Sequence, residues 1–501
     1  MTAIPYVNGA PHIGHVLDVL QADVLARYYR NSRTVFFLAG TDEHGQKNLK
    51  TAQELGIEVG EFVRKNSDLF KDFDKKLNIS FDYFVRTEDE DHKNVSQALW
   101  KKLNEAGDIY KKDYEGLYCV GCEVFVTEED LDESGNCPIH GKPPEKVKEE
   151  NYFFRLSKYT DKLRKAIKSG EFRVVPKSRQ NEILALFDRG LEDVSFSRPK
   201  RKLPWGIEVP GDPNHVMYVW CDALTNYLTG ISLRGNWDKG DNRENGGYDG
   251  TKGSEGEFWP PAIQIVGKDI LRFHAAIWPG MLLSAGLELP KTLLVHGFVT
   301  VNRQKLAKST GNIIDPIKYI DKYGADALRY YLLREIPTTD DGDFSHKRFV
   351  DLYNADLANN LGNLVNRVLT MANKYGADNF ASDYLLSLSK KVDQKIEDLT
   401  NFEKDEKQAF CQHLENFEFN RALENIWQKV DALNQQIDRE KPWEAAKLPH
   451  QDLVRIMVGI YLFKIEWIAR WLEPFLPETS KKILNQLATR KAEVLFPRID
   501  K

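Results

Sequence analysis

Apolar positions in the first half of the chain alternate between short strand-like runs and longer stretches with helical spacing. Ala3–Val7 and Thr34–Ala39, which ends at Gly40, are the first two strand-like runs. The stretch between them, from Pro11 to about Arg30, has apolar residues at a spacing of four: Val16, Leu20, Val24 and Tyr28. Three later strand-like runs each precede a helical stretch: Met217–Trp220, Ile263–Val266 and Leu293–Val295. This alternation predicts an α/β fold with a Rossmann-like, doubly wound parallel sheet whose ligand site lies at the strand ends.

Two regions depart from this alternation. Residues 108–195 interrupt it and contain a cluster of cysteines, so we expect an inserted domain there. After about Phe344 the strand signals stop, and apolar residues recur at the spacings of three and four that are typical of a helix bundle. They include Leu357, Leu361, Leu364 and Val368, and later Ile426, Val430, Leu433 and Ile437. We therefore expect five segments: the catalytic halves 1–107 and 196–298, the insertion 108–195, a connecting region 299–345 and a helical domain 346–501.

Composition narrows the class of protein. The chain has 501 residues, with 70 Lys and Arg against 75 Asp and Glu, so its formal net charge is −5. This balance excludes a histone-like polycation but not a local nucleic-acid site. The most apolar stretch, Ile456–Leu476, is interrupted by charged residues that include Lys464, Glu466 and Arg470, which predicts no membrane span. The first residues lack the basic start and apolar core of a signal peptide, which predicts a cytoplasmic protein. The glycine-rich stretch Arg234–Glu257 is expected to be a surface loop.

Four potential metal ligands occur in two chelating pairs. Cys119-x-x-Cys122 is followed by Cys137-x-x-His140. Two such pairs can close a tetrahedral zinc site, and a site with four protein ligands has no open position for catalysis. Disulfides are disfavoured because the chain has an odd number of cysteines, five, and no secretion signal. The spacing therefore predicts one structural Zn²⁺ within the insertion.

Paired histidines lie where a predicted strand meets a predicted helix. His12 and His15 share one face of the first helical turn, where backbone N–H groups and the helix dipole attract anions. Gly14 between them leaves room for a flat ring to approach the backbone. The motif predicts binding of a nucleoside polyphosphate and stabilisation of charge that builds on a phosphate. The alternative interpretation of this motif alone is a pair of ordinary capping histidines.

A second candidate segment lies far downstream. It reads Lys305-Leu306-Ala307-Lys308-Ser309, followed by Thr310-Gly311-Asn312. Two lysines in a loop rich in hydroxyl groups can close on phosphates and neutralise a pyrophosphate leaving group. By themselves, two lysines are more typical of a solvated surface. Phosphate binding becomes the favoured interpretation because the segment belongs to the same predicted sheet domain as the paired histidines.

Together the two motifs resemble the HIGH and KMSKS signatures of class I aminoacyl-tRNA synthetases. The segments IPYVNGAPHIGH, AGTDEHG, VWCDALTNYL, IVGKDILRFHAAIWP and HGFVTVNRQKLAKSTGN resemble the methionyl-tRNA synthetase family, in order, along essentially the whole chain. The resemblance implies activation of L-methionine with ATP and Mg²⁺ to methionyl-adenylate, with release of pyrophosphate. Transfer of the methionine to initiator and elongator tRNA(Met) would follow. The resemblance also implies an ATP site, with its histidines and lysines catalytic, made of His12, Gly14, His15, Lys305, Lys308 and Ser309.

The resemblance further implies a methionine pocket. Asp42 would pair with the ammonium group of the amino acid. Aromatic side chains would surround the thioether, because sulfur packs favourably against aromatic rings. These are Tyr6, Trp220, Tyr227, Phe273 and Trp278, and further matching positions are Ile4, Ala223, Leu224 and His274. Without the family, Asp42 is equally typical of a helix start, and the aromatic residues and His274 are typical of an ordinary core.

In the helical region, four residues match the family's anticodon-reading positions: Asn363, Arg367, Pro442 and Trp443. An exposed Trp can stack on a splayed base while Asn and Arg reach its Watson–Crick edge. A hydrophobic contact at a helix start is the alternative interpretation of Trp443. The insertion is too short for the hydrolytic editing domain that synthetases for similar aliphatic amino acids need. Because the chain ends after the helical region, we expect a monomer.

The sequence departs from the family pattern in two places. Leu306 and Ala307 stand where Met or Ile and then Ser are usual in the lysine motif, although both lysines and the final Ser remain. Only eleven residues precede His12, so we expect a shortened first strand. Two alternatives to the synthetase interpretation are another H-x-G-H nucleotidyltransferase and a non-catalytic tRNA-binding protein derived from a synthetase. Retention of the histidines, the lysines and Asp42 argues against the second, since a binding module has no need of pyrophosphate chemistry.

Overall fold

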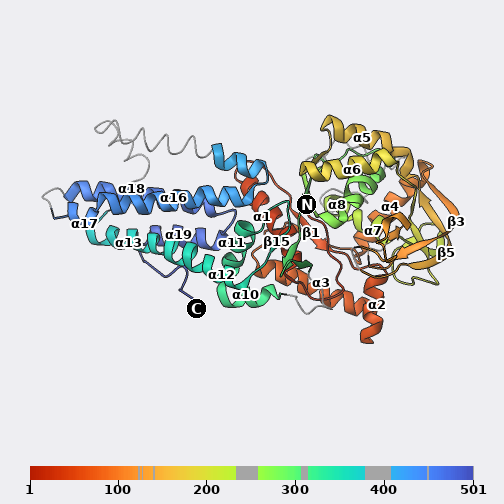
Figure 1. Ribbon diagram of the computed structural model, residues 1–501, viewed down its shortest axis with the longest axis horizontal. Coiled ribbons are helices and arrows are strands. Elements are labelled where there is room, and N and C mark those ends of the chain that lie inside the picture. Colours follow the sequence, from red (N-terminus) through yellow and green to blue (C-terminus); the bar gives the residue numbers. More distant parts are fainter. Residues whose placement is uncertain are drawn as a thin grey trace, which may run out of the picture. The chain divides into compact units, whose positions relative to one another are not determined.

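The computed structural model describes eight stretches of the chain: residues 1–121, 124–126, 128–138, 141–232, 258–305, 314–377, 408–447 and 451–499. Their contacts divide the chain into two compact units (Figure 1). The first unit comprises Met1–Pro11, Thr34–Lys75 and Ser80–His296. The second comprises His12–Arg33, Lys76–Ile79 and Gly297–Lys501. The predicted loop at Arg234–Glu257 lies outside the described residues.

A parallel sheet lies at the centre of the first unit. Its strands are β1 (Leu38–Thr41), β2 (Tyr83–Arg86), β6 (Arg173–Val175), β11 (Ile263–Gly267) and β12 (Thr292–His296). β1 pairs with β2, and β12 pairs with both β11 and β6. The first residues of the chain join the two groups, because Thr2 N–H donates to Leu38 O (3.2 Å) and Ala3 N–H donates to Ile265 O (3.0 Å). The chain start is thus central, as in a doubly wound fold.

Two of the predicted strands are confirmed and three predictions need correction. β11 and β12 lie where Ile263–Val266 and Leu293–Val295 were expected. The second strand begins only at Leu38, since the N–H of Phe37 donates to the Asp82 carboxylate (2.7 Å). That strand also continues through Gly40, where an added Cβ would lie 2.4 Å from the carbonyl oxygen of Val85.

The other two corrections concern the first and the third predicted strand. Ala3–Val7 makes isolated bridges, Thr2 to Ile265 and Tyr6 to Asp42, because Pro5 between them has no N–H to donate. Met217–Trp220 is the end of one strand and the start of a helix, since β10 (Asp212–Met217) is followed by α7 (Val219–Leu224). All six residues of α7 are buried, and a helix buried on every side has no polar face to reveal its period.

Antiparallel strands form the predicted insertion. They are β3 (Ile109–Cys119), β4 (Val124–Val126), β5 (Glu145–Phe154) and β7 (Val194–Ser195), in the order β4-β3-β5-β7. β3 and β5 pair along ten residues and form the long ribbon labelled in Figure 1. A second antiparallel sheet contains β10 between β8 (Ser197–Pro199) and β9 (Glu208–Val209). β6 lies within residues 108–195 yet pairs with the parallel sheet, so the central sheet takes one strand from that range.

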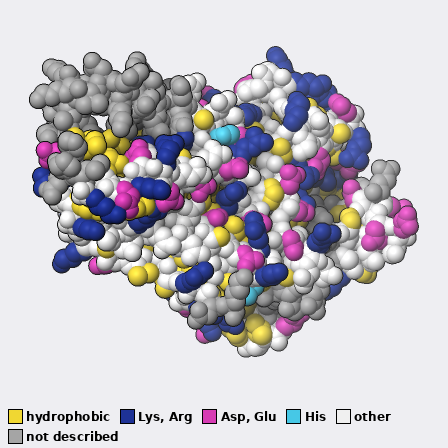
Figure 2. All heavy atoms as spheres, turned by 60° about the vertical axis from the view of Figure 1, so that its left-hand side comes forward, with side chains coloured by type: hydrophobic (Ala, Val, Ile, Leu, Met, Phe, Trp, Pro, Cys, Tyr) yellow, Lys and Arg dark blue, Asp and Glu magenta, His cyan; other side chains and the backbone are white. Residues whose placement is uncertain are grey.

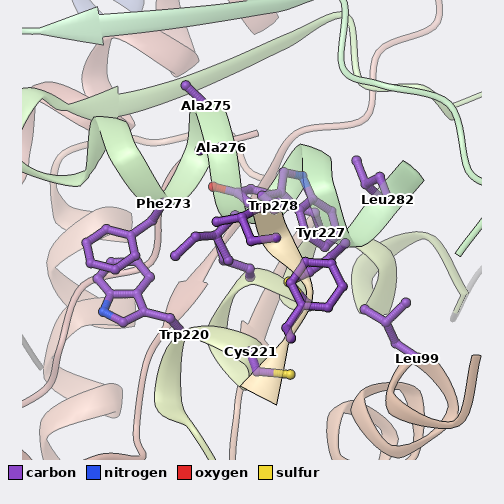
Figure 3. Close-up of a cluster of buried hydrophobic side chains, with 14 of the residues drawn as sticks. Leu99, Trp220, Cys221, Tyr227, Phe273, Ala275, Ala276, Trp278 and Leu282 are labelled. Atoms are coloured by element: carbon purple, nitrogen blue, oxygen red, sulfur yellow. The ribbon is translucent and has the colours of Figure 1, made fainter. Parts of the chain in front are cut away.

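Helices cover the sheets of the first unit. They are α2 (Gln46–Leu55), α3 (Val59–Lys76), α4 (Glu90–Glu105), α5 (Thr160–Ser169), α6 (Lys177–Arg189), α7, α8 (Asn226–Ser232) and α9 (Trp278–Ser284). Shorter helical segments are η2 (Glu128–Asp130), η3 (Leu156–Tyr159), η4 (Lys268–Ile270) and the π-helical η5 (Phe273–Ile277). Apolar residues of α4, α7, α8, η5 and α9 meet in one buried core (Figure 3).

The second unit is mainly helical. Its elements near the paired histidines are η1 (Ile13–His15), α1 (Val16–Arg30), the strands β13 (Val299–Val301), β14 (Gln304–Lys305) and β15 (Gly342–Asp343), and the helices α10 (Pro316–Tyr323) and α11 (Ala325–Glu335). The bundle that follows consists of α12 (His346–Leu352), the π-helical η7 (Tyr353–Gly362), α13 (Asn363–Tyr375), α16 (Phe419–Glu440), α17 (Pro442–Ala445), α18 (Gln451–Leu472) and α19 (Pro477–Thr489). α13, α16 and α18 run side by side (Figure 1).

The apolar residues that predicted the bundle are buried, which confirms the helical interpretation of the described part of residues 346–501. None of the helices in the described stretches is long and apolar enough to cross a membrane. On the face seen in Figure 2, Lys and Arg lie among Asp and Glu rather than in one large patch of a single sign, in keeping with the nearly balanced composition.

Candidate active site

The paired histidines cap the helix that they begin. His12 has an extended backbone, its Nδ1 accepts from Gly14 N–H (3.1 Å), and its own N–H donates to His15 Nδ1 (3.1 Å). The two rings stack with their centroids 3.7 Å apart. Each Nδ1 acts as an acceptor, so the neutral form of each ring carries its proton on Nε2. The capping interpretation is therefore correct, and it also fixes two Nε2–H donors on one helix start, where a phosphate is favoured.

The segment around these histidines is anchored within the second unit. Ile13 is fully buried, and its N–H donates to the carbonyl oxygen of Ile314 (3.1 Å). Farther along α1, Asp23 forms a fully buried ion pair with Arg329 (2.7 Å). Arg329 also donates to the carbonyl oxygens of Phe475, Pro474 and Leu77. The helix is thus held along its length, and its first turn has little freedom to move.

The residues on both sides of the undescribed part of the lysine segment have defined partners. On one side, Lys305 of β14 pairs with Thr300 of β13. On the other, the carbonyl oxygen of Ile314 accepts from the N–H of Ile13. Lys308 and Ser309 lie outside the described residues, as does the side chain of Lys305. Both ends of this loop therefore belong to the unit that carries His12 and His15, and one end is hydrogen-bonded to the histidine segment.

Asp42 lies directly after β1 in the first unit. It is buried, and its N–H donates to Pro5 O (2.9 Å) while its own carbonyl oxygen accepts from Val7 N–H (3.3 Å). These bonds place it beside Tyr6. α2 begins only at Gln46, so Asp42 is a residue of a strand end rather than of a helix start. A buried carboxylate at a strand end is suitably placed to bind a cationic group of a ligand.

The expected aromatic pocket residues pack against one another. Trp220 stacks on Phe273, with ring centroids 3.7 Å apart and planes at 7°, and Tyr6 meets Trp220 edge-on at 6.4 Å. Tyr227 and Trp278 lie deeper, with centroids 5.7 Å apart, and both are completely buried. Figure 3 shows Trp220 and Phe273 stacked at one side of the core that contains Tyr227 and Trp278. The aromatic residues therefore form a continuous wall within the first unit.

Three of the remaining expected contacts line the same region. Ala223 and Leu224 are buried on α7, and Ile4 is half-buried on the central segment of the sheet. His274 is buried on η5, where its Nδ1–H donates to Ile270 O (3.1 Å) and its Nε2 accepts from the Tyr227 hydroxyl (2.9 Å). His274 is therefore a hydrogen-bonded core histidine, as its alternative interpretation predicted. Its Nδ1 must be the donor in the first of these bonds, because a carbonyl oxygen can only accept.

Only half of the predicted zinc set lies within the described residues. Cys119 at the end of β3 and Cys137 are both buried, whereas Cys122 and His140 lie outside the described stretches. The backbone of Cys137 is hydrogen-bonded to both residues that follow the gap, because its N–H donates to Lys142 O (2.9 Å) and its carbonyl oxygen accepts from Gly141 N–H (2.8 Å). Gly141 has a φ of 61°, which glycine adopts readily. Among the described residues no cluster of three or more potential metal ligands occurs.

Three of the four expected anticodon residues are exposed or partly exposed on the second unit, and Pro442 is buried. Asn363 and Arg367 lie on α13, and Trp443 on α17 is 36% exposed. The Arg367 guanidinium lies over the Trp443 ring, 5.3 Å from its centroid, and pairs with Asp438. Pro442 is buried at the start of α17, where its ring suits the first helical position. The structure thus brings Arg367 and Trp443 together on one surface.

Sequence reasoning missed a set of buried charged residues around Asp42. Glu43 accepts two hydrogen bonds from Arg86, at 2.8 and 3.1 Å, and Asp222 lies within hydrogen-bonding distance of both His44 and His92. Glu43 and His44 stand in the quoted segment AGTDEHG, and Asp222 in VWCDALTNYL. The available signal was a run of charged residues among apolar ones, but their partners lie up to 178 positions away, and spacing along the chain does not reveal that.

Comparison with known proteins identifies the family of this chain. A family model described as tRNA synthetases class I (M) matches residues 1–142 and 129–369. The methionine–tRNA ligase of Caldanaerobacter subterraneus subsp. tengcongensis is 39% identical over 525 residues, covering 100% of this chain and 78% of that protein. The methionine–tRNA ligase of a Nostoc species is 41% identical over 488 residues, covering 97% of this chain and 89% of that protein.

A solved structure is also similar. It is the Mycobacterium tuberculosis methionyl-tRNA synthetase in complex with methionyl-adenylate, with a TM-score of 0.87 and 36% sequence identity, and it covers 99% of each chain. The chain therefore belongs to the methionyl-tRNA synthetases, a family of class I tRNA synthetases.

Proposed function

We propose that this chain is a methionine–tRNA ligase that activates L-methionine with ATP and transfers it to tRNA(Met). Membership of the family supports the overall reaction. The observation that best supports the chemistry is the hydrogen bond from Ile13 to Ile314 (3.1 Å), since it ties the histidine segment to one end of the lysine loop. Phosphate chemistry needs donors whose positions are fixed before the reaction begins.

In the first step, a carboxylate oxygen of methionine attacks the α-phosphorus of ATP, and pyrophosphate leaves. His12 and His15 would donate through Nε2–H to phosphate oxygens as charge builds there, and the backbone at Gly14 would lie against the nucleotide. Lys305, Lys308 and Ser309 would hold the leaving pyrophosphate. Mg²⁺ bound with ATP would supply further neutralisation of the phosphates. Methionyl-adenylate is the molecule bound in the similar Mycobacterium tuberculosis structure, which supports this step for the present chain.

The first unit would hold the methionine. Asp42 would accept the ammonium group, and the wall of Tyr6, Trp220 and Phe273 would contact the thioether. Tyr227, His274 and Trp278, with Ile4, Ala223 and Leu224, would set the depth of the pocket. His274 is held in place by its two hydrogen bonds and would form part of the pocket wall. The small insertion favours discrimination by this pocket over hydrolytic editing.

In the second step, a hydroxyl of the terminal tRNA ribose attacks the methionyl carbonyl, and AMP leaves. Asn363, Arg367, Pro442 and Trp443 would recognise the anticodon of initiator and elongator tRNA(Met). The cation–π contact between Arg367 and Trp443 supports this assignment, because it keeps a ring and hydrogen-bond donors together on one surface. We further propose that the chain works as a monomer in the cytoplasm. Residues 108–195, apart from the sheet strand β6, would be an insertion between catalytic halves 1–107 and 196–298, ahead of the connecting region 299–345 and the helical domain 346–501.

A structural Zn²⁺ would be held by Cys119, Cys122, Cys137 and His140. The buried state of Cys119 and Cys137 and the hydrogen bonds of Cys137 with Gly141 and Lys142 fit such a site. The metal would crosslink two turns of the insertion without taking part in the reaction. Metal analysis of the purified protein should give one zinc per chain, and Cys137→Ser should lower the zinc content. Zinc at less than half an equivalent in the unsubstituted protein would contradict this assignment.

The experiment that tests the proposed function is ATP–pyrophosphate exchange with methionine, leucine, isoleucine, valine and cysteine, followed by charging of tRNA(Met). We expect exchange with methionine well above that with the other four, and its loss in His15→Asn. Exchange that prefers another amino acid would contradict the pocket assignment while leaving the class I chemistry intact. Binding of tRNA without exchange would instead favour the non-catalytic alternative, and activity on a different nucleotide acceptor would favour a nucleotidyltransferase.

A further inference from the structure

Asp222 is a completely buried carboxylate to which the proposed reaction assigns no role. It lies on α7 between Trp220 and Ala223, and it is 1% exposed. One carboxylate oxygen lies 2.6 Å from His44 Nδ1, and the other lies 2.7 Å from His92 Nε2. An ionised carboxylate can only accept, so both imidazoles donate to it. A single side chain thus links two histidines that stand 48 positions apart in the sequence.

His44 is held as an imidazolium by two carboxylates. Its second ring nitrogen lies 2.7 Å from Glu88, which also accepts from Lys93 (2.7 Å). Burial alone would lower the pKa of His44, but the charge and hydrogen bond of Asp222, together with Glu88, outweigh burial and raise it to about 10. In the same way, burial would raise the pKa of Asp222, whereas His44 and His92 lower it to about 2. His44 and Asp222 therefore remain charged at neutral pH.

The link reaches the turn that carries Asp42. His44 N–H donates to the Asp42 carboxylate (3.3 Å), and the Asn48 side chain donates to the carbonyl oxygens of Asp42 (3.2 Å) and His44 (3.1 Å). Residues 42–44 therefore form one rigid turn. Any movement of the His44 ring would be transmitted to the carboxylate that we expect to bind the ammonium group.

On its other side, the link holds the position of α7. His92 of α4 donates to Asp222, and its Nδ1 lies 2.9 Å from the hydroxyl of Thr229 on α8. α7 carries three of the residues expected to contact the methionine side chain: Trp220, Ala223 and Leu224. Asp222 thus joins the element expected to hold the ammonium group to the element expected to hold the side chain, and both elements lie in the first unit.

We propose that Asp222 is a positioning residue for methionine, which sets the spacing between the Asp42 turn and α7 through its hydrogen bonds to His44 and His92. This inference rests on the proposed methionine site. The two ends of an amino acid are separated by a fixed number of bonds, so a change in this spacing weakens binding of both ends together. Stability alone is a poor reason for such a cluster, because well-packed apolar residues are often as stabilising as buried charges.

The test is Asp222→Asn, measured by ATP–pyrophosphate exchange. The amide keeps the shape of the side chain but can accept only through its oxygen, so its NH₂ group faces one imidazole N–H. We expect the KM for methionine to rise at least about tenfold, because shifts of a fraction of an ångström in a binding site have effects of this size. The KM for ATP should stay within about twofold, since the variant leaves the phosphate-binding residues unchanged.

Asp108→Asn is a matched control. Asp108 is also fully buried in the first unit and accepts from Lys158 (2.7 Å), Ser284 (2.7 Å) and Tyr159. It has no hydrogen bond to the Asp42 turn or to α7 among the described contacts. We expect this variant to lower the thermal midpoint by an amount similar to that for Asp222→Asn while leaving the KM for methionine within about twofold of the unsubstituted value.

The possible outcomes separate this inference from the proposed function. If the unsubstituted protein exchanges with methionine and Asp42→Asn does not, the methionine site stands. An unchanged KM for methionine in Asp222→Asn would then overturn the positioning role alone, as would equal rises in the KM values for methionine and ATP. His92→Gln provides a milder variant if Asp222→Asn fails to fold, and a selective rise in the KM for methionine is expected there too. A folded His92→Gln with unchanged methionine KM would also contradict the proposal.

Discussion

The methionine pocket and the anticodon surface proposed for this chain are built in opposite ways. In the first unit, Asp42, Tyr227 and His274 are buried, and hydrogen bonds to neighbouring elements fix each of them. On the second unit, Trp443 is 36% exposed and its side-chain neighbour is Arg367, at 5.3 Å. A small ligand with few atoms requires a rigid site, because each misplaced contact is a large share of its binding energy. A nucleotide base supplies a whole face for stacking and tolerates a simpler surface.

The largest effect is expected from Asp42→Asn in the buried region. Loss of one partner of a buried charge pair costs about 2–5 kcal/mol, so kcat/KM for methionine should fall at least about 30-fold in pyrophosphate exchange. The asparagine is nearly isosteric, and the thermal midpoint should change little. A fall of less than about threefold would show that Asp42 does not bind the ammonium group.

A smaller effect, on a different step, is expected from Trp443→Ala. Stacking of a base on an aromatic side chain is worth about 1–3 kcal/mol, so kcat/KM for tRNA(Met) should fall about tenfold or more in aminoacylation. Pyrophosphate exchange without tRNA should be unchanged. Leu453→Ala is the matched control, because Leu453 is an exposed apolar residue on α18 of the same bundle. Equal losses in the two variants would mean that Trp443 has no special role in tRNA binding.

Tyr227→Phe tests whether the hydrogen bonds inside the pocket matter beyond its shape. The change removes the hydroxyl that donates to His274 Nε2 (2.9 Å) and leaves that buried nitrogen without its donor. We expect a cost of about 1 kcal/mol, seen as a rise of about fivefold in the KM for methionine. The KM for tRNA should not change. Normal methionine kinetics in Tyr227→Phe would mean that the Tyr227 hydroxyl does not contribute to methionine binding and that only its ring does.

The buried charges also predict how stability depends on pH. The pKa of His44 is raised to about 10 in the fold, mainly because the charges of Asp222 and Glu88 outweigh burial. Unfolded histidine titrates near pH 6.5, so this contribution is complete below about pH 6.5 and is lost as the pH rises through about 10. The pKa of Asp222 is lowered to about 2, so its contribution is complete above about pH 4 and is lost as the pH falls toward 2.

Thermal melting between pH 6 and pH 9.5 measures this dependence. The midpoint of the unsubstituted protein should fall across this range, and that of Asp222→Asn should fall less, because the carboxylate that raises the pKa of His44 is absent. Trp443→Ala should follow the unsubstituted protein, since the substitution changes no titratable group. Parallel curves for the unsubstituted protein and Asp222→Asn would contradict the charged state assigned to His44.

The sequence was informative where a residue's role depends on its near neighbours. The spacing of Val16, Leu20, Val24 and Tyr28 predicted α1, and the apolar runs before Gly267 and His296 predicted β11 and β12. The expected strand Met217–Trp220 extended two residues into α7, Val219 and Trp220, because all residues of that helix are buried. The link from His44 to Asp222 could not be predicted, since the partners are 178 positions apart and only the fold brings them together. The family resemblance indicated Asp42 and Trp220 as pocket residues. It did not predict the contacts that hold them, which are the backbone hydrogen bonds of Asp42 and the stacking of Trp220 on Phe273.

The most direct test of this account is methionine-dependent pyrophosphate exchange without tRNA, measured side by side for the unsubstituted protein, Asp42→Asn and Trp443→Ala. We predict equal exchange for the unsubstituted protein and Trp443→Ala, and almost none for Asp42→Asn. Exchange that survives in Asp42→Asn, or that is lost in Trp443→Ala, would contradict the assignment of methionine activation to the buried pocket and of tRNA reading to the exposed surface.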